Sequence, residues 1–250
     1  MRKAMGAVVA SVALLGVWTP GQAAAATVLE TYSFNCISAN SVSCQGTQAL
    51  ESQLFMDVST VDGNANQADF TFRNTGPIAS SITDIYFDDG TLLGISLIID
   101  GAGVDFEANA TPGELPGANN ATPDFETTAG FSADSEEPIQ PLGVNPGESL
   151  VIRFTLLAGQ TAADVVAALD AGLLLDSDDD DPTGTLRVGI HVQGLPGGTS
   201  DALITGSGGS GGSGGQQVVP EPTSLLLLGT GLGIVAVRSR RNRKRHSLAA

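Results

Sequence analysis

The feature that most constrains the fold of this chain is a period-two alternation of apolar and polar residues in several short segments. This period places the apolar side chains on one face, as a strand with one buried face requires. Four segments show it, with apolar residues at Leu54, Met56 and Val58; at Ala68, Phe70 and Phe72; at Leu150, Ile152, Phe154 and Leu156; and at Leu186, Val188, Ile190 and Val192. Repeated short strands with polar turns predict a mainly all-β fold, an antiparallel β-sandwich.

Two connections between the predicted strands have signals of their own. Residues 81–100 contain two apolar segments separated by Asp88, Asp89 and Gly90, which is typical of a tight β-hairpin turn. Residues 108–148 are rich in proline, glycine and acidic residues. We therefore expect them to form one long loop over the surface.

One short helix is predicted within the β-rich body, at residues 161–172. Thr161 is a suitable N-cap, and Asp164 three residues later completes a pattern that resembles a capping box. Gly172 is a suitable C-terminal stop. The predicted inner face of this helix consists of Val165, Val166 and Leu169.

Residues 1–25 have the layout of a secretory signal peptide. Arg2 and Lys3 form a basic region, residues 6–18 are apolar, and small residues at positions 23–26 fit an A-x-A cleavage site. The apolar segment is shorter than the ~20 residues that span a bilayer comfortably. The alternative is a buried N-terminal helix, but the order of the three regions favours export. Signal peptidase and the export machinery are then expected partners.

The body that follows, residues 27–205, is strongly acidic. It contains 26 acidic residues against three arginines, which gives a formal net charge of −23. A surface this negative repels nucleic acid and anionic lipid, and it attracts cations. The sequence therefore argues against nucleic acid as a partner. A Gly/Ser-rich linker, residues 206–217, separates the body from the C-terminal segment.

The two cysteines of the chain, Cys36 and Cys44, are close together in the sequence. In an exported protein such a pair predicts one disulfide that closes a local loop. The alternative, a redox or nucleophilic role, has less support.

The C-terminal residues 218–246 have three parts. Pro220, Glu221 and Pro222 interrupt any helix, because each proline lacks an N–H donor and restricts the preceding residue. Residues 225–237 carry no charge and are short for a permanent membrane span. Six basic residues follow: Arg238, Arg240, Arg241, Arg243, Lys244 and Arg245. Since such residues stay on the cytoplasmic side, we expect a transient hold in the inner membrane with the body outside.

This order of elements resembles the PEP-CTERM sorting signal. The resemblance implies an exported protein of a Gram-negative bacterium that makes exopolysaccharide. It also implies recognition by exosortase, a membrane-embedded, cysteine transpeptidase-like enzyme that removes the tail near the Pro-Glu-Pro. The alternative, an ordinary tail anchor, leaves the paired prolines unexplained. Residues 69–93 and 186–198 are also similar to segments of β-rich extracellular proteins that bear this signal, a group that brings no known activity.

Residues that could support catalysis are few. His246 lies in the tail, which leaves His191 for a hydrolase triad, and its place on the polar face beside Arg187 favours an exposed strand histidine. A glycosidase needs two carboxylates beside a sugar site, but no pair stands out among so many. Tyr32 and Tyr86 are the only tyrosines and the body has no tryptophan, which weakens the glycosidase and lectin hypotheses. We expect no enzymatic activity.

An aspartate-rich segment gives the one candidate metal site. Asp176, Asp178 and Asp180 alternate in a D-x-D-x-D pattern that could surround a calcium ion with oxygen ligands. The following residues depart from an EF-hand loop, since Asp181 stands at the glycine position and Arg187 at the glutamate position. Two interpretations stay open, a calcium site and a solvated acidic loop, of which the loop is favoured. No other cofactor is indicated.

The sequence thus predicts an exported, non-enzymatic, acidic β-rich protein of the cell surface or extracellular matrix, sorted and cleaved by exosortase. Its expected role is structural or interactive, through exopolysaccharide, cations or other matrix proteins. A polysaccharide-binding, lectin-like module is the second hypothesis, and a secreted hydrolase is the third.

Overall fold

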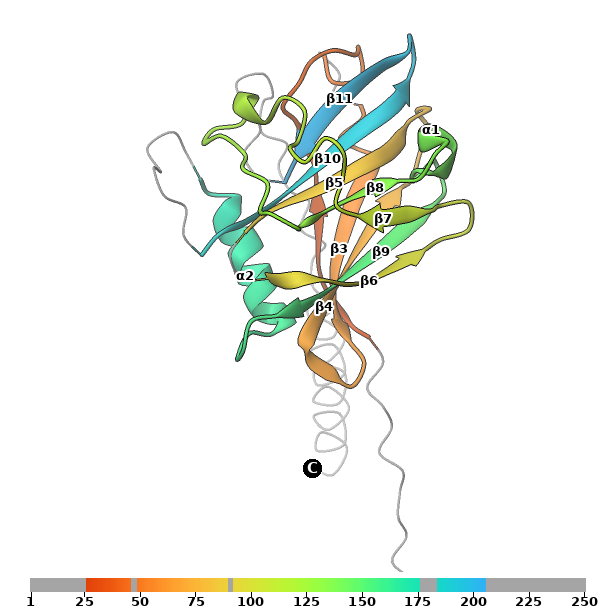
Figure 1. Cartoon of the computed structure of the whole chain (residues 1–250). Helices are drawn as coiled ribbons and strands as arrows, with labels where there is room; N and C mark the ends of the chain where they lie inside the picture. Colours follow the sequence, from red (N-terminus) through yellow and green to blue (C-terminus); the bar gives the residue numbers. More distant parts are fainter. Residues whose placement is uncertain (1–25, 46–48, 90–91, 176–183, 206–250) are drawn as a thin grey trace, which may run out of the picture. The chain divides into compact units, whose positions relative to one another are not determined.

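The computed structural model describes residues 26–45, 49–89, 92–175 and 184–205. They form two antiparallel sheets that pack face to face, which confirms the predicted β-sandwich (Figure 1). The predicted signal peptide, linker, membrane segment and sorting tail lie outside the described residues. Among the residues described, no helix combines the length and the apolar character that a membrane crossing needs.

The two sheets are built from eleven strands with antiparallel neighbours throughout the described residues. The five-stranded sheet has the order β1 (Val28–Ser33), β3 (Leu54–Val61), β4 (Asn64–Asn74), β9 (Ser149–Leu156) and β6 (Leu92–Asp100). The six-stranded sheet has the order β2 (Asn35–Cys36), β11 (Thr199–Ile204), β10 (Leu186–Leu195), β5 (Ser81–Asp89), β8 (Ser132–Ser135) and β7 (Phe106–Ala108).

The core lies between the inner faces of the two sheets. The apolar residues of the four alternating segments are all buried there, as predicted. Phe87 of the six-stranded sheet meets Phe154 of the five-stranded sheet edge to face, with 4.6 Å between ring centroids. Phe70 also lies edge to face against both rings. The inward-facing halves of the strands therefore form a continuous aromatic core.

The hairpin predicted within residues 81–100 is wrong. β5 pairs with β10 and β8 in one sheet, whereas β6 pairs with β9 in the other. The chain therefore crosses between the sheets where a hairpin was expected, although residues 90–91 themselves lie outside the described residues. The composition of the turn indicates that the chain reverses its direction. A hairpin and a crossing between the sheets both require such a reversal, so the composition does not distinguish them.

The single long loop predicted for residues 108–148 is also wrong in part. It contains a short 3₁₀ helix, η1 (Ala118–Asn120), the strand β8, and a short helix, α1 (Ile139–Leu142). Residues 110–125, which we call the covering segment, lie on the outer face of the six-stranded sheet (Figure 1). A second, smaller core forms under this segment from Ile37, Tyr86, Ala110, Leu115, Ala121, Phe125, Ala202 and Ile204.

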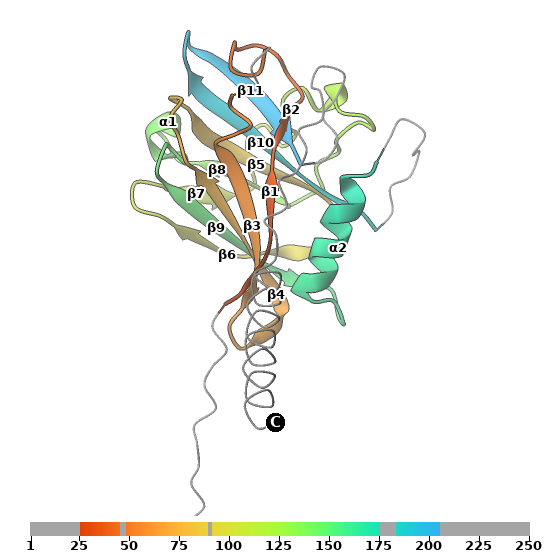
Figure 2. The ribbon, with the colours of Figure 1, turned by 180° about the vertical axis from the view of Figure 1, so that it is seen from behind.

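The predicted helix is α2 (Ala162–Gly172), and it closes one side of the sandwich against β10, β4, β3 and β1 (Figure 2). Its N-terminus is held as predicted, because the Asp164 carboxylate accepts hydrogen bonds from the Thr161 backbone N–H at 2.8 Å and from its hydroxyl at 2.7 Å. Gly172 serves packing, since a Cβ there would lie 2.3 Å from the Leu186 carbonyl oxygen.

The predicted disulfide is confirmed. Cys36 at the end of β2 is bonded to Cys44, and both residues are buried. The bridge closes the short loop that precedes β3, and this loop packs beside β11 through hydrogen bonds from the Ile37 and Ser38 N–H groups to the Ala202 carbonyl.

Candidate binding site on the six-stranded sheet

The outer face of the six-stranded sheet carries a row of ionisable residues. The strand register places His191 of β10 beside Asp84 of β5, Asp84 beside Asp134 of β8, and Asp134 beside Glu107 of β7. Neighbouring strands lie about 4.8 Å apart, so adjacent members of this row influence one another.

His191 is held by Asp84. The imidazole Nδ1 lies 2.9 Å from the Asp84 Oδ2 atom, which also accepts a hydrogen bond from the Thr83 hydroxyl at 2.7 Å. The side chains of His191 and Asp84 are 14% and 7% exposed. The predicted exposed strand histidine is therefore wrong, because segments distant in the sequence lie over this face of β10.

Asp134 is the least satisfied member of the row. Its Oδ2 accepts a hydrogen bond from the Thr111 N–H at 3.0 Å, whereas its buried Oδ1 has no hydrogen-bond partner among the described residues. Burial raises the pKa of Asp134, and the negative charge of Asp84 raises it further, against the opposing effect of the Thr111 N–H. The ionised form of Asp134 is therefore disfavoured at its place beside the His191–Asp84 pair.

A polar recess of about 270 Å³ opens beside His191. Its polar lining comes from the loop after β2, from η1, and from β10 and β11: Ser38, Asn40, Asn120, His191, Ser200 and Asp201. Asp201 is 1% exposed, and its carboxylate accepts hydrogen bonds from the Ser38 hydroxyl at 2.8 Å and from the Asn40 and Ser41 N–H groups at 2.7 and 3.0 Å. These three hydrogen bonds attach the loop to β11 beside the recess.

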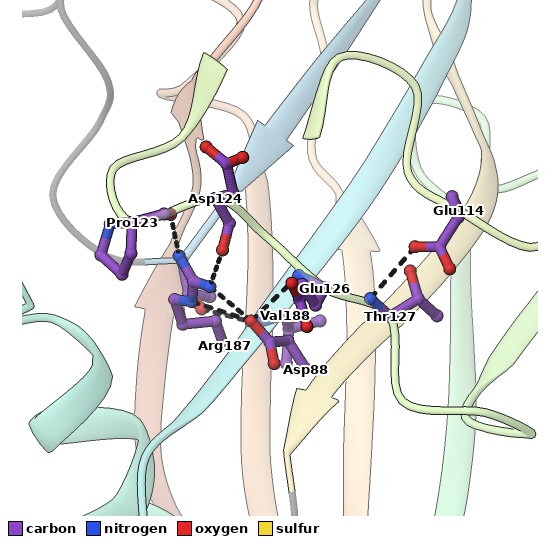
Figure 3. A network of polar contacts seen from close by, with 9 residues as sticks. Asp88, Glu114, Pro123, Asp124, Glu126, Thr127, Arg187 and Val188 are labelled. Atoms are coloured by element: carbon purple, nitrogen blue, oxygen red, sulfur yellow. Dashed lines mark hydrogen bonds and ion pairs between the residues drawn. The ribbon is translucent and has the colours of Figure 1, made fainter. Parts of the chain in front are cut away.

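Arg187 fixes the covering segment to the sheet (Figure 3). Its guanidinium donates to the Asp88 carboxylate, with 3.1 Å from Nε, and to the carbonyls of Pro123 at 2.7 Å and Asp124 at 2.6 Å. The same group lies 5.4 Å from the centre of the Phe125 ring. Since the Arg187 side chain is 4% exposed, this is a buried charge with several partners.

The other two arginines of the body are also paired. On the outer face of the five-stranded sheet, Arg73 lies 2.7 Å from Asp57 and Arg153 lies 2.6 Å from Asp69, each with two hydrogen bonds. All three arginines of the body therefore have their charge neutralised by a neighbouring aspartate.

Residues 218–241 match the family model of the PEP-CTERM protein-sorting motif. This chain carries a PEP-CTERM sorting motif. The motif implies export, sorting to the cell surface and exosortase as the processing partner. No curated protein and no solved structure matches this chain.

Most of the predicted site residues lie outside the described residues. These are the Pro-Glu-Pro at residues 220–222, the basic cluster at residues 238–245, and the aspartates of the calcium hypothesis, Asp176, Asp178 and Asp180. Within the described ranges, no group of three or more histidine, cysteine or acidic residues is arranged to hold a metal ion. The calcium hypothesis stays a prediction.

The recess was not predicted from the sequence, although one signal was present. Gly189 interrupts the strongly β-forming segment of β10, and a Cβ at this position would lie 2.7 Å from Leu115 Cδ2 and 3.1 Å from Phe125 Cζ. Glycine within a strand often marks the close approach of another segment. Here that approach brings the covering segment onto the sheet.

Proposed function

We propose that this PEP-CTERM protein is a non-enzymatic component of the cell surface or extracellular matrix, with a structural or interaction role toward exopolysaccharide. The sorting motif supplies the location, and the acidic body supplies the means of interaction. The acidic surface associates with cations and, through them, with polymer and with other matrix proteins.

One observation carries this proposal: the body's three arginines are each paired with an aspartate. Their charge is used inside the fold, so the acidic residues in excess remain to interact with the surroundings. Many of these are exposed in the described residues, including Asp62, Glu107 and Glu126. Divalent cations reduce the repulsion within such a surface and bridge it to an anionic polymer.

Co-sedimentation of the exported protein with the polysaccharide of the producing cells tests this role. We expect association in calcium that is reversed by a chelator and weakened by high salt. The triple variant with asparagine at Asp176, Asp178 and Asp180 shows whether that segment supplies the cation site or whether the whole surface does. Absence of association under every condition contradicts the proposal, and shortening of the polysaccharide chains would establish the hydrolase hypothesis instead.

The processing step has its own test. Mass spectrometry of the exported protein should show a chain that ends near Pro220, Glu221 and Pro222. Replacement of the six basic residues at positions 238–245 with glutamine should weaken membrane retention and processing, because the cytoplasmic-side hold is lost. An extracellular chain that still ends at Ala250 would contradict exosortase cleavage.

A lectin-like role is the second candidate, and the polar recess beside His191 is the observation that favours it. This role differs from the first because it requires one defined site and a preference among sugars. A glycan array with and without calcium separates the two, since a specific sugar that binds without calcium favours the lectin-like role.

A further inference from the structure

We propose that the recess beside His191 binds a single neutral sugar residue through hydrogen bonds to its hydroxyl groups. This inference rests on the proposed interaction with polysaccharide, and it assigns that interaction a site, a set of contact residues and a charge preference. The recess volume of about 270 Å³ is close to the lower end of ligand pockets, which begin near ~300 Å³. It therefore suits one ring of a polymer better than a larger cofactor.

The recess is pre-organised by groups that lie beneath it. Asp201 uses its carboxylate to hold the Ser38 hydroxyl and the backbone of the loop that carries Asn40. The disulfide between Cys36 and Cys44 encloses the same loop. A site that is ordered before binding loses less entropy when a ligand enters.

His191 supplies one contact with a fixed orientation. Its Nδ1 is engaged by Asp84, which leaves Nε2 as the ring nitrogen without a hydrogen-bond partner among the described residues. The carboxylate on one ring nitrogen fixes how the imidazole is turned. His191 lines the recess, and we assign the contact with a ligand hydroxyl to Nε2.

Two asparagines from different elements, Asn40 of the loop after β2 and Asn120 of η1, supply the remaining contacts. The Asn40 Nδ2 donates to the Ser200 carbonyl at 3.0 Å, and this leaves its Oδ1 as an acceptor. The carboxamide of Asn120, which is exposed on η1, makes no hydrogen bond to a described residue. A carboxamide offers a donor and an acceptor side by side, as neighbouring sugar hydroxyls require.

The charge around the recess favours a neutral ligand over an acidic one. Neither lysine nor arginine contributes to its lining, whereas Asp201 does, and Asp84 lies beside His191. A uronate carboxylate would be repelled by these groups and by the acidic body as a whole. Apart from the imidazole, the lining contains no aromatic ring for stacking. Binding of one residue is then weak, and affinity for a polymer comes from repeated contacts.

The test is histidine NMR of the isotope-labelled exported protein, titrated with glucose, galactose and mannose and, separately, with glucuronate. We expect at least one neutral sugar to shift the His191 ring resonances in a saturable manner, with glucuronate at least tenfold weaker. Asn120→Ala should weaken this binding about tenfold, the loss of one well-placed pair of hydrogen bonds. Asn64→Ala, an exposed asparagine on β4, is the matched control and should leave it unchanged.

Equal binding by the two variants, or the absence of any shift of His191 with all three neutral sugars, would overturn the inference. The outcome is separable from that of the proposed function. If Asn120→Ala still co-sediments with polysaccharide in calcium while the sugar titrations are flat, the acidic surface acts alone and the recess assignment fails. If sugars bind at His191 but the polymer does not sediment with the protein, the broader proposal fails.

Discussion

On the outer face of each sheet, an arginine is held by an aspartate and lies over a phenylalanine ring. Arg187 with Asp88 and Phe125 forms this group on the six-stranded sheet, with 5.4 Å from guanidinium to ring centre. Arg73 with Asp57 and Phe55 forms it on the five-stranded sheet, with 5.5 Å.

The two groups differ in what covers them. The side chain of Arg187 is 4% exposed, while that of Arg73 is 36% exposed. The covering segment lies over the first group and contributes Phe125 and two carbonyl partners, whereas Phe55 comes from the same sheet as its arginine. The same three types of side chain therefore make a buried contact between two segments on one sheet and a surface contact on the other.

The largest expected difference in stability is between two variants that each lack one of these arginines. Arg187→Met leaves the Asp88 carboxylate and the carbonyls of Pro123 and Asp124 without their donor in a buried place, so we expect a loss of about 3–5 kcal/mol. Arg73→Met removes a half-exposed ion pair, which is worth at most about 1 kcal/mol. Urea denaturation of both variants measures the difference. Similar losses would show that the covering segment does not bury Arg187 in solution.

Replacement of the two phenylalanines should also destabilise the protein more on the covered face than on the open face, by a smaller difference than for the arginines. Phe125→Ala opens a cavity in the second core, where the ring is 2% exposed, and should cost about 3 kcal/mol. Phe55→Ala loses a partly exposed ring and its contact with Arg73, worth about 0.5–1 kcal/mol. The midpoint of urea unfolding gives both values. A larger effect at Phe55 would reverse the comparison.

Gly189→Ala tests the close approach of the covering segment to β10. The added methyl group would meet Leu115 and Phe125, and over-packing of this kind costs about 1–2 kcal/mol. Gly113→Ala is the control within the covering segment, because a Cβ there has no atom within 4 Å. Hydrogen exchange of the covering segment should increase in the Gly189 variant alone. Equal exchange in both variants would mean that the segment does not depend on this glycine.

The smallest expected effect depends on pH. The pKa of Asp134 is raised by burial and by Asp84, so the folded protein binds more protons than the unfolded chain between the ordinary carboxyl pKa and the raised one. The charge of Asp134 therefore costs stability as pH rises through this window. Asp134→Asn should raise Tm at pH 7, and the gain should vanish below about pH 3, where the carboxyl group is protonated in both states.

Thermal unfolding of the parent and of Asp134→Asn across this pH range gives the sign directly. Asp57→Asn is the contrasting variant on the open face, since it removes the partner of Arg73 and should lower Tm at pH 7. A gain for Asp134→Asn that persists at pH 3 would point to a packing effect rather than to the buried charge.

Several features of this protein follow from the sequence by itself. The inner faces of the strands, the N-terminal cap of α2, the disulfide and the sorting motif are each encoded by residues close together in the chain. Alternation along one strand is enough to say which side chains meet the core, because an inward face has the same apolar requirement whatever strand lies opposite. A cap and a short disulfide loop are local in the same sense.

Other features were decided by the tertiary structure alone. The separation of β5 and β6 into different sheets depends on which distant strands they join, β10 and β9, and the turn between them has the same composition in either arrangement. The polar residues of β10 predict a solvated outer face, but a segment much earlier in the chain lies over that face and buries Arg187 and much of His191. The recess exists because these non-local segments meet there, and the period of a single strand carries no information about such a meeting.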